Sequence, residues 1–283
     1  MVLSRILVKH FYLLIIILIS ANCSNEIAEE ADFGESIIRI GKISMSIGET
    51  NEWGWKENDR LTVNANSQTA TYTYTTAGKW QTDNTDFTKE ALGEVAASSI
   101  QLTFGTAELT TDQSEESKYR LADYMTGTGS LDFLTISGTL EHQYTDLVIN
   151  IIAGDGWGTG QFDKVMADAA GLQVKTTNPA NTVAAYHPAS TAIFRAIIPP
   201  ASLPRGTNVS LSTLTLGSGT NTPDFLQGKQ ASITYNNNTN TEVDLKNKRL
   251  TLTLRLDVSL TVTMTGITLK DFIYNDVPDS LKP

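Results

Sequence analysis

Few side chains in this sequence have the types and spacing that enzyme chemistry requires. There is one cysteine, Cys23, and there are three histidines, His10, His142 and His187. Neither His142 nor His187 has a second histidine or a cysteine at metal-ligand spacing, and a lone histidine in a strand-rich chain is usually a hydrogen-bonded structural residue. No G-x-S-x-G nucleophile motif is present. The sequence therefore predicts no catalytic residue, no metal site, no cofactor and no enzymatic activity.

One glycine-rich stretch, AGDGWGTGQFD at residues 153–163, is similar in composition to a ligand-binding loop. It lacks the Lys-Ser/Thr pair of a phosphate-binding loop and the spaced oxygen ligands of an EF-hand. We interpret it as a turn that exposes Trp157. Trp157 is the candidate ligand contact, because an exposed indole ring can stack on a sugar or pack against a protein.

The cysteine lies at the end of an export signal. Residues 11–19 are all apolar, follow two basic residues and precede small polar residues. This run is shorter than the ~20 residues that span a bilayer, and it is typical of a secretory signal. An apolar run followed by a small residue and a cysteine is the pattern of a bacterial lipoprotein signal, in which the thiol is acylated. We predict a signal peptide over residues 1–22 and lipid attachment at Cys23.

Two features keep a secreted protein or a retained anchor as the alternative to a lipoprotein. Ser20 stands where the lipoprotein pattern usually has leucine, and Asn22 is an unusual neighbour of the cysteine. Acidic residues dominate the segment that follows, and we interpret residues 23–35 as an acidic tether between the lipid anchor and the folded chain. A diacylated anchor would hold the protein stably in the outer membrane.

The charge of the chain argues against nucleic acid as a partner. Residues 1–22 contain two basic residues and no acidic one, so the remainder has 19 basic and 31 acidic residues, a formal net charge of −12. Binding to a phosphate backbone requires clustered cations. With a single cysteine, the exported chain must be stabilised by packing rather than by disulfide bonds.

The elements that must carry any site are strands. Apolar residues alternate with polar ones from Leu250 to Met264, and this period of two is typical of a half-buried strand. Fifteen residues would span ~50 Å, so the strand must bend near Asp257 and Ser259 or run along two domains. Shorter alternating runs, separated by Gly, Pro and Asn turns, occur around residues 70–74, 100–104, 147–151, 194–198 and 214–216.

Helical patterns are few. Residues 86–97 and 161–170 each predict a short helix, the second with Phe162, Val165 and Met166 on one face. The many short strands predict an all-β fold of one or two β-sandwiches.

The first strand, SIIRIGKISMSI at residues 36–47, changes the face of its apolar residues at Gly41. Ile38 and Ile40 have one parity, and Ile43 and the apolar residues after it have the other. A glycine at such a switch predicts a β-bulge.

Several segments, in order and spacing, resemble the fimbrillin family of the Bacteroidales, the subunits and adhesins of type V pili. The likeness covers nearly the whole chain after the leader. The segments that carry it are WGWKENDRLTV (53–63), YTYTTAGKW (72–80), DQS (112–114) with ADYM (122–125), LEH (140–142) with DLVINI, FRAIIPPASLPRGTNVSL (194–211), and LKNKRLTLTLRL (245–256) leading to ITLKDF. The chain departs from the family at Leu140, where Phe usually stands, and at Phe272, where Trp often stands.

The resemblance implies two transthyretin-like β-sandwich domains in tandem, which we place at residues 36–127 and 128–283. It also implies export as an outer-membrane lipoprotein and a non-enzymatic role in cell-surface fimbriae. Its partners would be other pilus subunits, joined head-to-tail by strand addition, the outer membrane through acylated Cys23, and a ligand on a host or bacterial surface.

In family members that form pilus shafts, an arginine- or lysine-specific protease removes the first strand. Arg39 and Lys42 are the candidate cleavage points here, and an ordinary outward-facing strand residue is the other interpretation of Arg39. Without cleavage the protein would be a tip, an anchor or a stand-alone surface lipoprotein. A surface lipoprotein that binds glycans through its tryptophans is the alternative function.

Overall fold

The computed structural model describes residues 36–45, 55–94, 99–177, 179–237 and 245–271. All of the strands and helices below lie in one compact unit, Ile38–Pro283. The predicted signal peptide, Cys23 and the acidic tether lie outside the described residues. Strands dominate and form three sheets, so the predicted all-β class is confirmed at the level of a mostly β chain with short helices.

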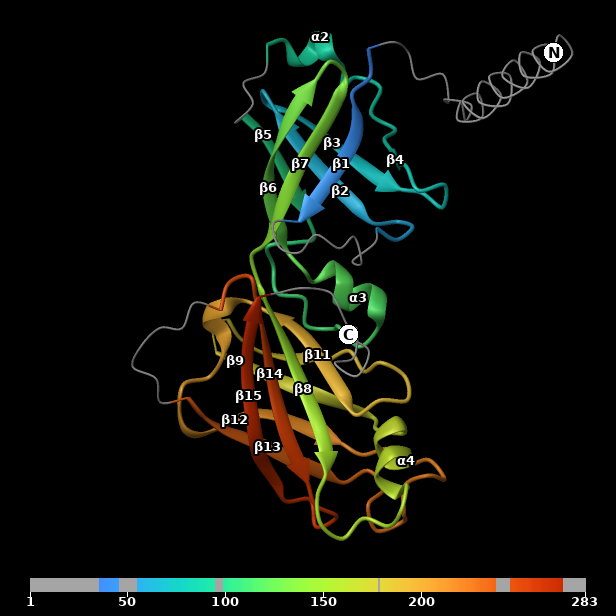
Figure 1. Ribbon diagram of the computed structural model, residues 1–283, viewed down its shortest axis with the longest axis vertical. Coiled ribbons are helices and arrows are strands. Elements are labelled where there is room, and N and C mark those ends of the chain that lie inside the picture. Colours follow the sequence, from blue (N-terminus) through green and yellow to red (C-terminus); the bar gives the residue numbers. More distant parts are fainter. Residues whose placement is uncertain (1–35, 46–54, 95–98, 178, 238–244, 272–283) are drawn as a thin grey trace, which may run out of the picture. The chain divides into compact units, whose positions relative to one another are not determined.

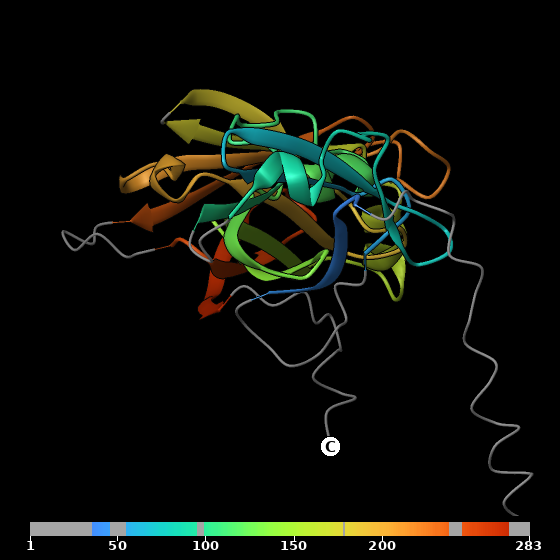
Figure 2. The same ribbon diagram turned by 90° about the horizontal axis from the view of Figure 1, so that it is seen from above.

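The first sheet has seven strands in the order β1-β7-β6-β5-β2-β3-β4. All neighbours are antiparallel except β1 and β7, which are parallel. Figures 1 and 2 show β1, in blue, beside β7, in green. The strands are β1 (Arg39–Met45), β2 (Arg60–Ala65), β3 (Gln68–Tyr74), β4 (Trp80–Gln81), β5 (Ile100–Phe104), β6 (Met125–Asp132) and β7 (Thr135–His142).

The bulge predicted at Gly41 is present in β1. Ile40 lies opposite Ile136 of β7, whereas Ile43 lies opposite Gly138, so three steps along β1 match two along β7. The extra residue turns the buried face of the strand over. Ile38, just before β1, and Ile43 both reach the core of this sheet, with 1% and 9% of their surface exposed.

The other two sheets have four strands each, in the orders β10-β9-β12-β13 and β11-β8-β14-β15. Their apolar rows form one large core cluster, to which β8, β9, β11, β12, β13 and β14 all contribute. The strands are β8 (Thr145–Ala153), β9 (Gly171–Thr177), β10 (Ala180–Ala184), β11 (Ile193–Ile198), β12 (Gly206–Thr215), β13 (Gln230–Asn237), β14 (Lys248–Leu256) and β15 (Val262–Asp271).

The predicted domain boundary between residues 127 and 128 does not match the sheets. It falls inside β6, which pairs with β5 on one side and with β7 on the other. The sheets change between His142, the last residue of β7, and Thr145, the first residue of β8. Gly127 and Gly129 are residues of β6, and a Cβ at Gly127 would lie 1.8 Å from the carbonyl oxygen of Thr139.

The long alternating run is a hairpin rather than a single strand. It divides into β14 and β15, which pair antiparallel, and the turn lies at Asp257–Thr261, where the bend was expected. The amide of Leu260 donates to the carbonyl oxygen of Asp257, at 2.9 Å. Leu260 has a positive φ of 66°, which is rare for a branched residue.

The helices are short. The helix expected at 161–170 is α4 (Gln161–Ala167), and it buries Phe162, Val165 and Met166 as predicted. The helix expected at 86–97 is reduced to α2 (Lys89–Leu92), capped by Thr88. The sequence did not predict α3 (Glu116–Leu121) or the 3-10 helix η3 (Pro200–Ser202). None of the helices in the described ranges has the length and apolarity needed to cross a membrane.

Candidate functional site

The start of β1 is attached to the first sheet by side chains and by backbone. Ile38 is almost fully buried, its amide donates to the carbonyl oxygen of Phe87 at 3.1 Å, and its own carbonyl accepts from the hydroxyl of Tyr72 at 2.8 Å. Burial raises the pKa of Tyr72, so its hydroxyl stays protonated and able to donate. This segment is therefore a fitted part of the sheet.

The two basic residues of β1 differ in accessibility. Arg39 is half-buried, and its amide donates to the carbonyl oxygen of Leu134 at 2.7 Å. Lys42 is exposed and lies within the bulge, between the paired residues Ile40 and Ile43. The Lys42 side chain is accessible to a protease, whereas the Arg39 side chain is partly covered, and hydrolysis at either residue requires the strand to open locally.

Beneath β1 lies the backbone edge of β7. Ile136 and Leu140 of β7 have no exposed surface, and the register pairs them with Ile40 and Met45. The two strands approach closely at Gly41, where a Cβ would lie 2.7 Å from both Ser137 Oγ and Thr135 Cγ2. Removing β1 would thus uncover an unpaired strand edge together with an apolar row.

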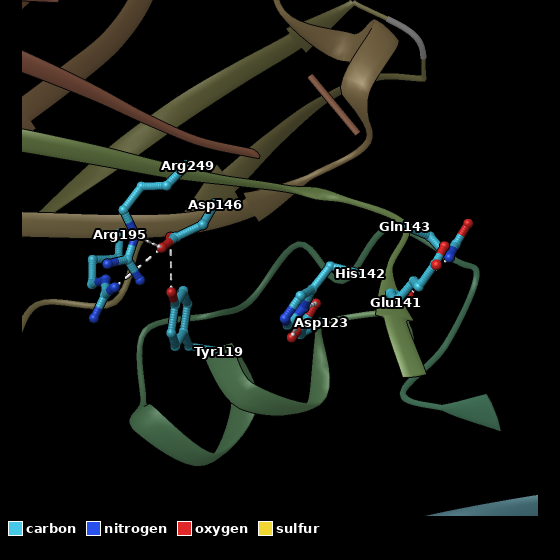
Figure 3. Close-up of polar contacts among 8 residues, drawn as sticks. All are labelled: Tyr119, Asp123, Glu141, His142, Gln143, Asp146, Arg195 and Arg249. Carbon is cyan, nitrogen blue, oxygen red and sulfur yellow. Dashed lines mark hydrogen bonds and ion pairs between the residues drawn. The ribbon is translucent and has the colours of Figure 1, made fainter. Parts of the chain in front are cut away.

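A second notable site is a cluster of buried charges around Asp146 (Figure 3). Asp146, on β8, has no exposed surface. Its Oδ2 lies 3.1 Å from Nη2 of Arg195 on β11 and 2.6 Å from Nε of Arg249 on β14, and its Oδ1 accepts a 2.8 Å hydrogen bond from the hydroxyl of Tyr119 on α3. Three strands of one sheet and a helix therefore meet at one carboxylate.

The charges of this cluster determine the protonation states of Asp146 and Tyr119. Burial alone would raise the pKa of Asp146, but Arg195 and Arg249 together hold the pKa below its usual value. Burial, and then the charge of Asp146, raise the pKa of Tyr119 well above its usual value. The carboxylate is thus ionised and the phenol is neutral at physiological pH, as the donated hydrogen bond requires.

The chain between β5 and β6, which includes α3, makes further buried polar contacts. Nδ1 of His142 lies 2.8 Å from Oδ2 of Asp123, and Nη2 of Arg120 lies 2.8 Å from Oδ2 of Asp59. The first pair is visible in Figure 3. His142 is thus the hydrogen-bonded structural histidine that the sequence predicted.

The side chain of Gln113, in the same segment, hydrogen-bonds to the backbone of β11 as a neighbouring strand would. Its Oε1 accepts from the amide of Ile197 at 2.7 Å, and its Nε2 donates to the carbonyl oxygen of Ile197 at 2.8 Å. Gln113 has no exposed surface. These hydrogen bonds attach the segment to β11. Both are made to backbone atoms of Ile197, so they do not depend on which side chain stands at that position.

Trp157, the candidate ligand contact, is half-buried. Its Nε1 donates to the carbonyl oxygen of Leu256 at 2.7 Å, and its ring packs edge-on against Phe162, with centroids 5.5 Å apart. The tryptophans at 55 and 80 pack on each other, with centroids 4.9 Å apart. The ring of His187 stacks on Phe194, and its Nε2 lies 2.9 Å from the carbonyl oxygen of Thr191.

These arrangements are suited to holding strands rather than to catalysis. The Asp146 carboxylate is shielded from solvent and bonded through both oxygens. No group of three or more metal-ligating side chains occurs within the described ranges. Strand β1 is an edge strand of the first sheet, with an exposed lysine at its bulge.

Comparison with solved structures identifies the fold. A putative cell adhesion protein from Bacteroides uniformis superposes with a TM-score of 0.50 and 13% sequence identity, covering 86% of this chain and 100% of the other. A second one, from Bacteroides ovatus, gives a TM-score of 0.51 and 12% identity, covering 85% and 99%. The likeness at these identities is one of fold, and it is consistent with the resemblance to fimbrillins.

A fimbrial protein from Bacteroides ovatus also matches, with a TM-score of 0.40 and 12% identity over 79% of this chain and 50% of the other. No protein-family model matches the sequence. A search of curated proteins likewise gives no match.

Proposed function

We propose that this protein is a fimbrillin-like structural or adhesive component of cell-surface fimbriae, built from two transthyretin-like β-sandwich domains and exported as a lipoprotein acylated at Cys23. Support comes from the ordered segments shared with fimbrillins and from a fold like that of the Bacteroides cell adhesion proteins. Those relatives are not described as enzymes, in keeping with a non-enzymatic role. The protein would act at the outer-membrane surface or within a fimbrium.

The observation that carries this proposal is the position of β1. It is an edge strand, it pairs parallel with β7, and residues at its start and beyond its bulge fill the core of the first sheet. A strand at an edge can leave without breaking the order of the remaining six strands. The uncovered edge of β7 could then accept a strand of another subunit, with backbone hydrogen bonds providing affinity and alternate side chains providing specificity.

The maturation step would be hydrolysis of one peptide bond in β1. We place it after Lys42 in preference to Arg39, because Lys42 is exposed in the bulge and Arg39 is half-buried in the paired part of the strand. Cleavage there would separate Ile38, with its two backbone contacts, from the rest of the chain. Residues 43–45 would stay on the product, and an incoming strand would have to displace them from β7. Cys23 would leave with it, and the freed protein could assemble head-to-tail.

An uncleaved protein would have a different role at the cell surface. The lipid at Cys23 would then keep the folded chain at the outer membrane, as an anchor or a stand-alone adhesin. The glycan-binding alternative has less support, because the N–H of Trp157 already donates to Leu256 and the ring contacts Phe162.

A strand-replacement experiment tests the proposal. The purified chain is treated with a lysine-specific protease, the protease is inhibited, the released N-terminal fragment is removed, and a labelled synthetic peptide of residues 36–42 is added. We expect the peptide to bind the cleaved protein and not the uncleaved one. A control peptide with Asp in place of Ile38 should not bind, because a carboxylate cannot replace an apolar side chain in the core. Equal binding of both peptides would rule out strand addition at β7.

A further inference from the structure

Strand β15 is a long sheet edge. It has ten residues, and β14 is the only described strand that pairs with it. Figure 1 shows the two strands side by side in red. Unpaired backbone groups on a sheet edge form a template for pairing with another strand.

The apolar row of this strand is exposed. Ile267 lies opposite Leu252 of β14 and Leu269 lies opposite Leu250, so both point to the same face of the sheet as these buried leucines. Leu252 and Leu250 are 0% and 5% exposed, whereas Ile267 and Leu269 are 62% and 41% exposed. The core-facing row of the sheet thus continues onto β15 without being covered there.

The chain covers other edges of the same two sheets. At β10, Asp112 pairs with Ala184 in a parallel bridge, and at β11, Tyr186 and Arg195 exchange two backbone hydrogen bonds. On the β13 edge the core-facing apolar residues are buried, namely Ala231, Ile233 and Tyr235. Among the described strands of these sheets, β15 therefore combines an open edge with an open apolar row.

The protective devices usual at an edge lie on either side of residues 266–269 of β15. The register shift against β14 falls between Thr253 and Leu254, which places a bulge at Thr265. The two charged residues, Lys270 and Asp271, are the last of the strand, and it contains no proline. The stretch from Gly266 to Leu269 is regular and uncharged, and no second strand of the described ranges pairs with it.

We propose that β15 is a self-association surface that pairs antiparallel with β15 of a second copy of this chain, about a two-fold axis at Thr268. In this register Ile267 of one copy lies opposite Leu269 of the other, so four apolar side chains cover one another on the core-facing side. Thr268 faces Thr268, a favourable cross-strand pair.

A second copy of the chain is the partner because the sequence of β15 is complementary to itself in this register. In the same register Lys270 falls opposite Gly266 and Asp271 opposite Thr265, so no two like charges oppose each other. An isologous contact of this kind closes on itself as a dimer. It is separate from β1 and β7, and it would therefore form whether or not β1 is removed.

Disulfide trapping tests the register. Cα atoms directly opposite in an antiparallel pair are ~4.5–5.5 Å apart, within the range that a disulfide spans. In a Cys23→Ser background, where the introduced thiol is the only one, the full-length chain carrying Thr268→Cys should oxidise to a covalent dimer. Thr263→Cys on the same strand should not, because the two copies of residue 263 would lie ~30 Å apart at ~3.3 Å per residue. Absence of the Thr268→Cys dimer, or equal cross-linking of both variants, overturns the proposal.

Sedimentation equilibrium gives a second, independent test. Wild-type protein should show a concentration-dependent dimer, and Ile267→Lys should shift it to monomer, because the substitution places two lysines in the apolar contact. Ile152→Lys is the matched control: Ile152 is 38% exposed on β8 of the same sheet, away from the edge, and the dimer should persist. A wild-type monomer at all concentrations, or equal loss of dimer in both variants, contradicts the proposal.

Discussion

The hydroxyl of Tyr72 donates a buried hydrogen bond of 2.8 Å to the carbonyl oxygen of Ile38. This bond links the middle of β3 to the residue that leads into the first strand. Tyr72→Phe keeps the ring but leaves the carbonyl without this donor, which costs ~1–3 kcal/mol at a buried site. We expect the start of β1 to open more often and to be cleaved about tenfold faster by a lysine-specific protease, because cleavage of a transiently open state follows its population.

Tyr74→Phe, on the same strand, is the control. Tyr74 is half-buried and packs against Trp80. The lysine-specific protease should therefore cleave the Tyr74→Phe variant at a rate close to that of the wild type. Equal acceleration in both variants would show that the Tyr72 bond does not hold β1.

Gly41 offers a way to loosen β1 without removing a hydrogen bond. Gly41→Ala would push a methyl group against Ser137 and Thr135, both 2.7 Å from the Cβ position. Overpacking of this kind costs ~1–3 kcal/mol, and we expect faster cleavage at Lys42 with a lower urea midpoint. Gly158→Ala, in an exposed turn where the nearest atom would lie 3.3 Å away, should change neither quantity.

The Asp146 cluster should respond strongly to loss of its carboxylate. Asp146→Asn leaves Arg195 and Arg249 without a buried counter-charge, and breaking a buried ion pair in this way costs ~3–5 kcal/mol. Urea unfolding followed by circular dichroism measures the loss. Asp112→Asn removes the exposed carboxylate that pairs with Lys118 and should change the midpoint little. Similar losses in the two variants would contradict the role of the cluster.

Acid should weaken the protein through the same carboxylate. The folded chain holds the pKa of Asp146 below the ordinary value of 3.8, so in acid the unfolded chain binds a proton that the folded chain does not. The stabilisation from Asp146 is therefore full above about pH 4 and declines as the pH falls toward the folded-state pKa. The free energy of unfolding, measured from pH 6 to pH 2.5, should fall less steeply in Asp146→Asn than in wild type.

Much of the fold could be predicted because strand periodicity survives in a single sequence. The runs around 70–74, 100–104, 147–151 and 194–198 all lie in strands, and the bulge at Gly41 follows from the change of parity. The hairpin between β14 and β15 was harder to predict, because Val258, Leu260 and Val262 continue the alternation through the turn. Leu260 adopts the left-handed conformation without the Gly or Asn that would indicate it.

The buried charges were missed for a different reason. A charge within an apolar strand, such as Arg195 in IFRAII or Asp146 in TDLVINIIA, indicates that a partner exists but not where it lies in the sequence. Arg249 is 103 residues from Asp146, and α3, which brings Tyr119, has no clear apolar periodicity. Pairing of this kind depends on topology, which one sequence does not contain.

The most direct measurement of the central claim is the fate of the exported protein after digestion with a lysine-specific protease, followed by intact-mass analysis and by electrophoresis without boiling. A displaceable first strand predicts one early cut after Lys42, a product that begins at Ile43, and a ladder of multimers made from that product. A first strand that resists cleavage while other sites are cut, or a product that begins at Ile43 and stays free of multimers, would contradict assembly through the edge of β7.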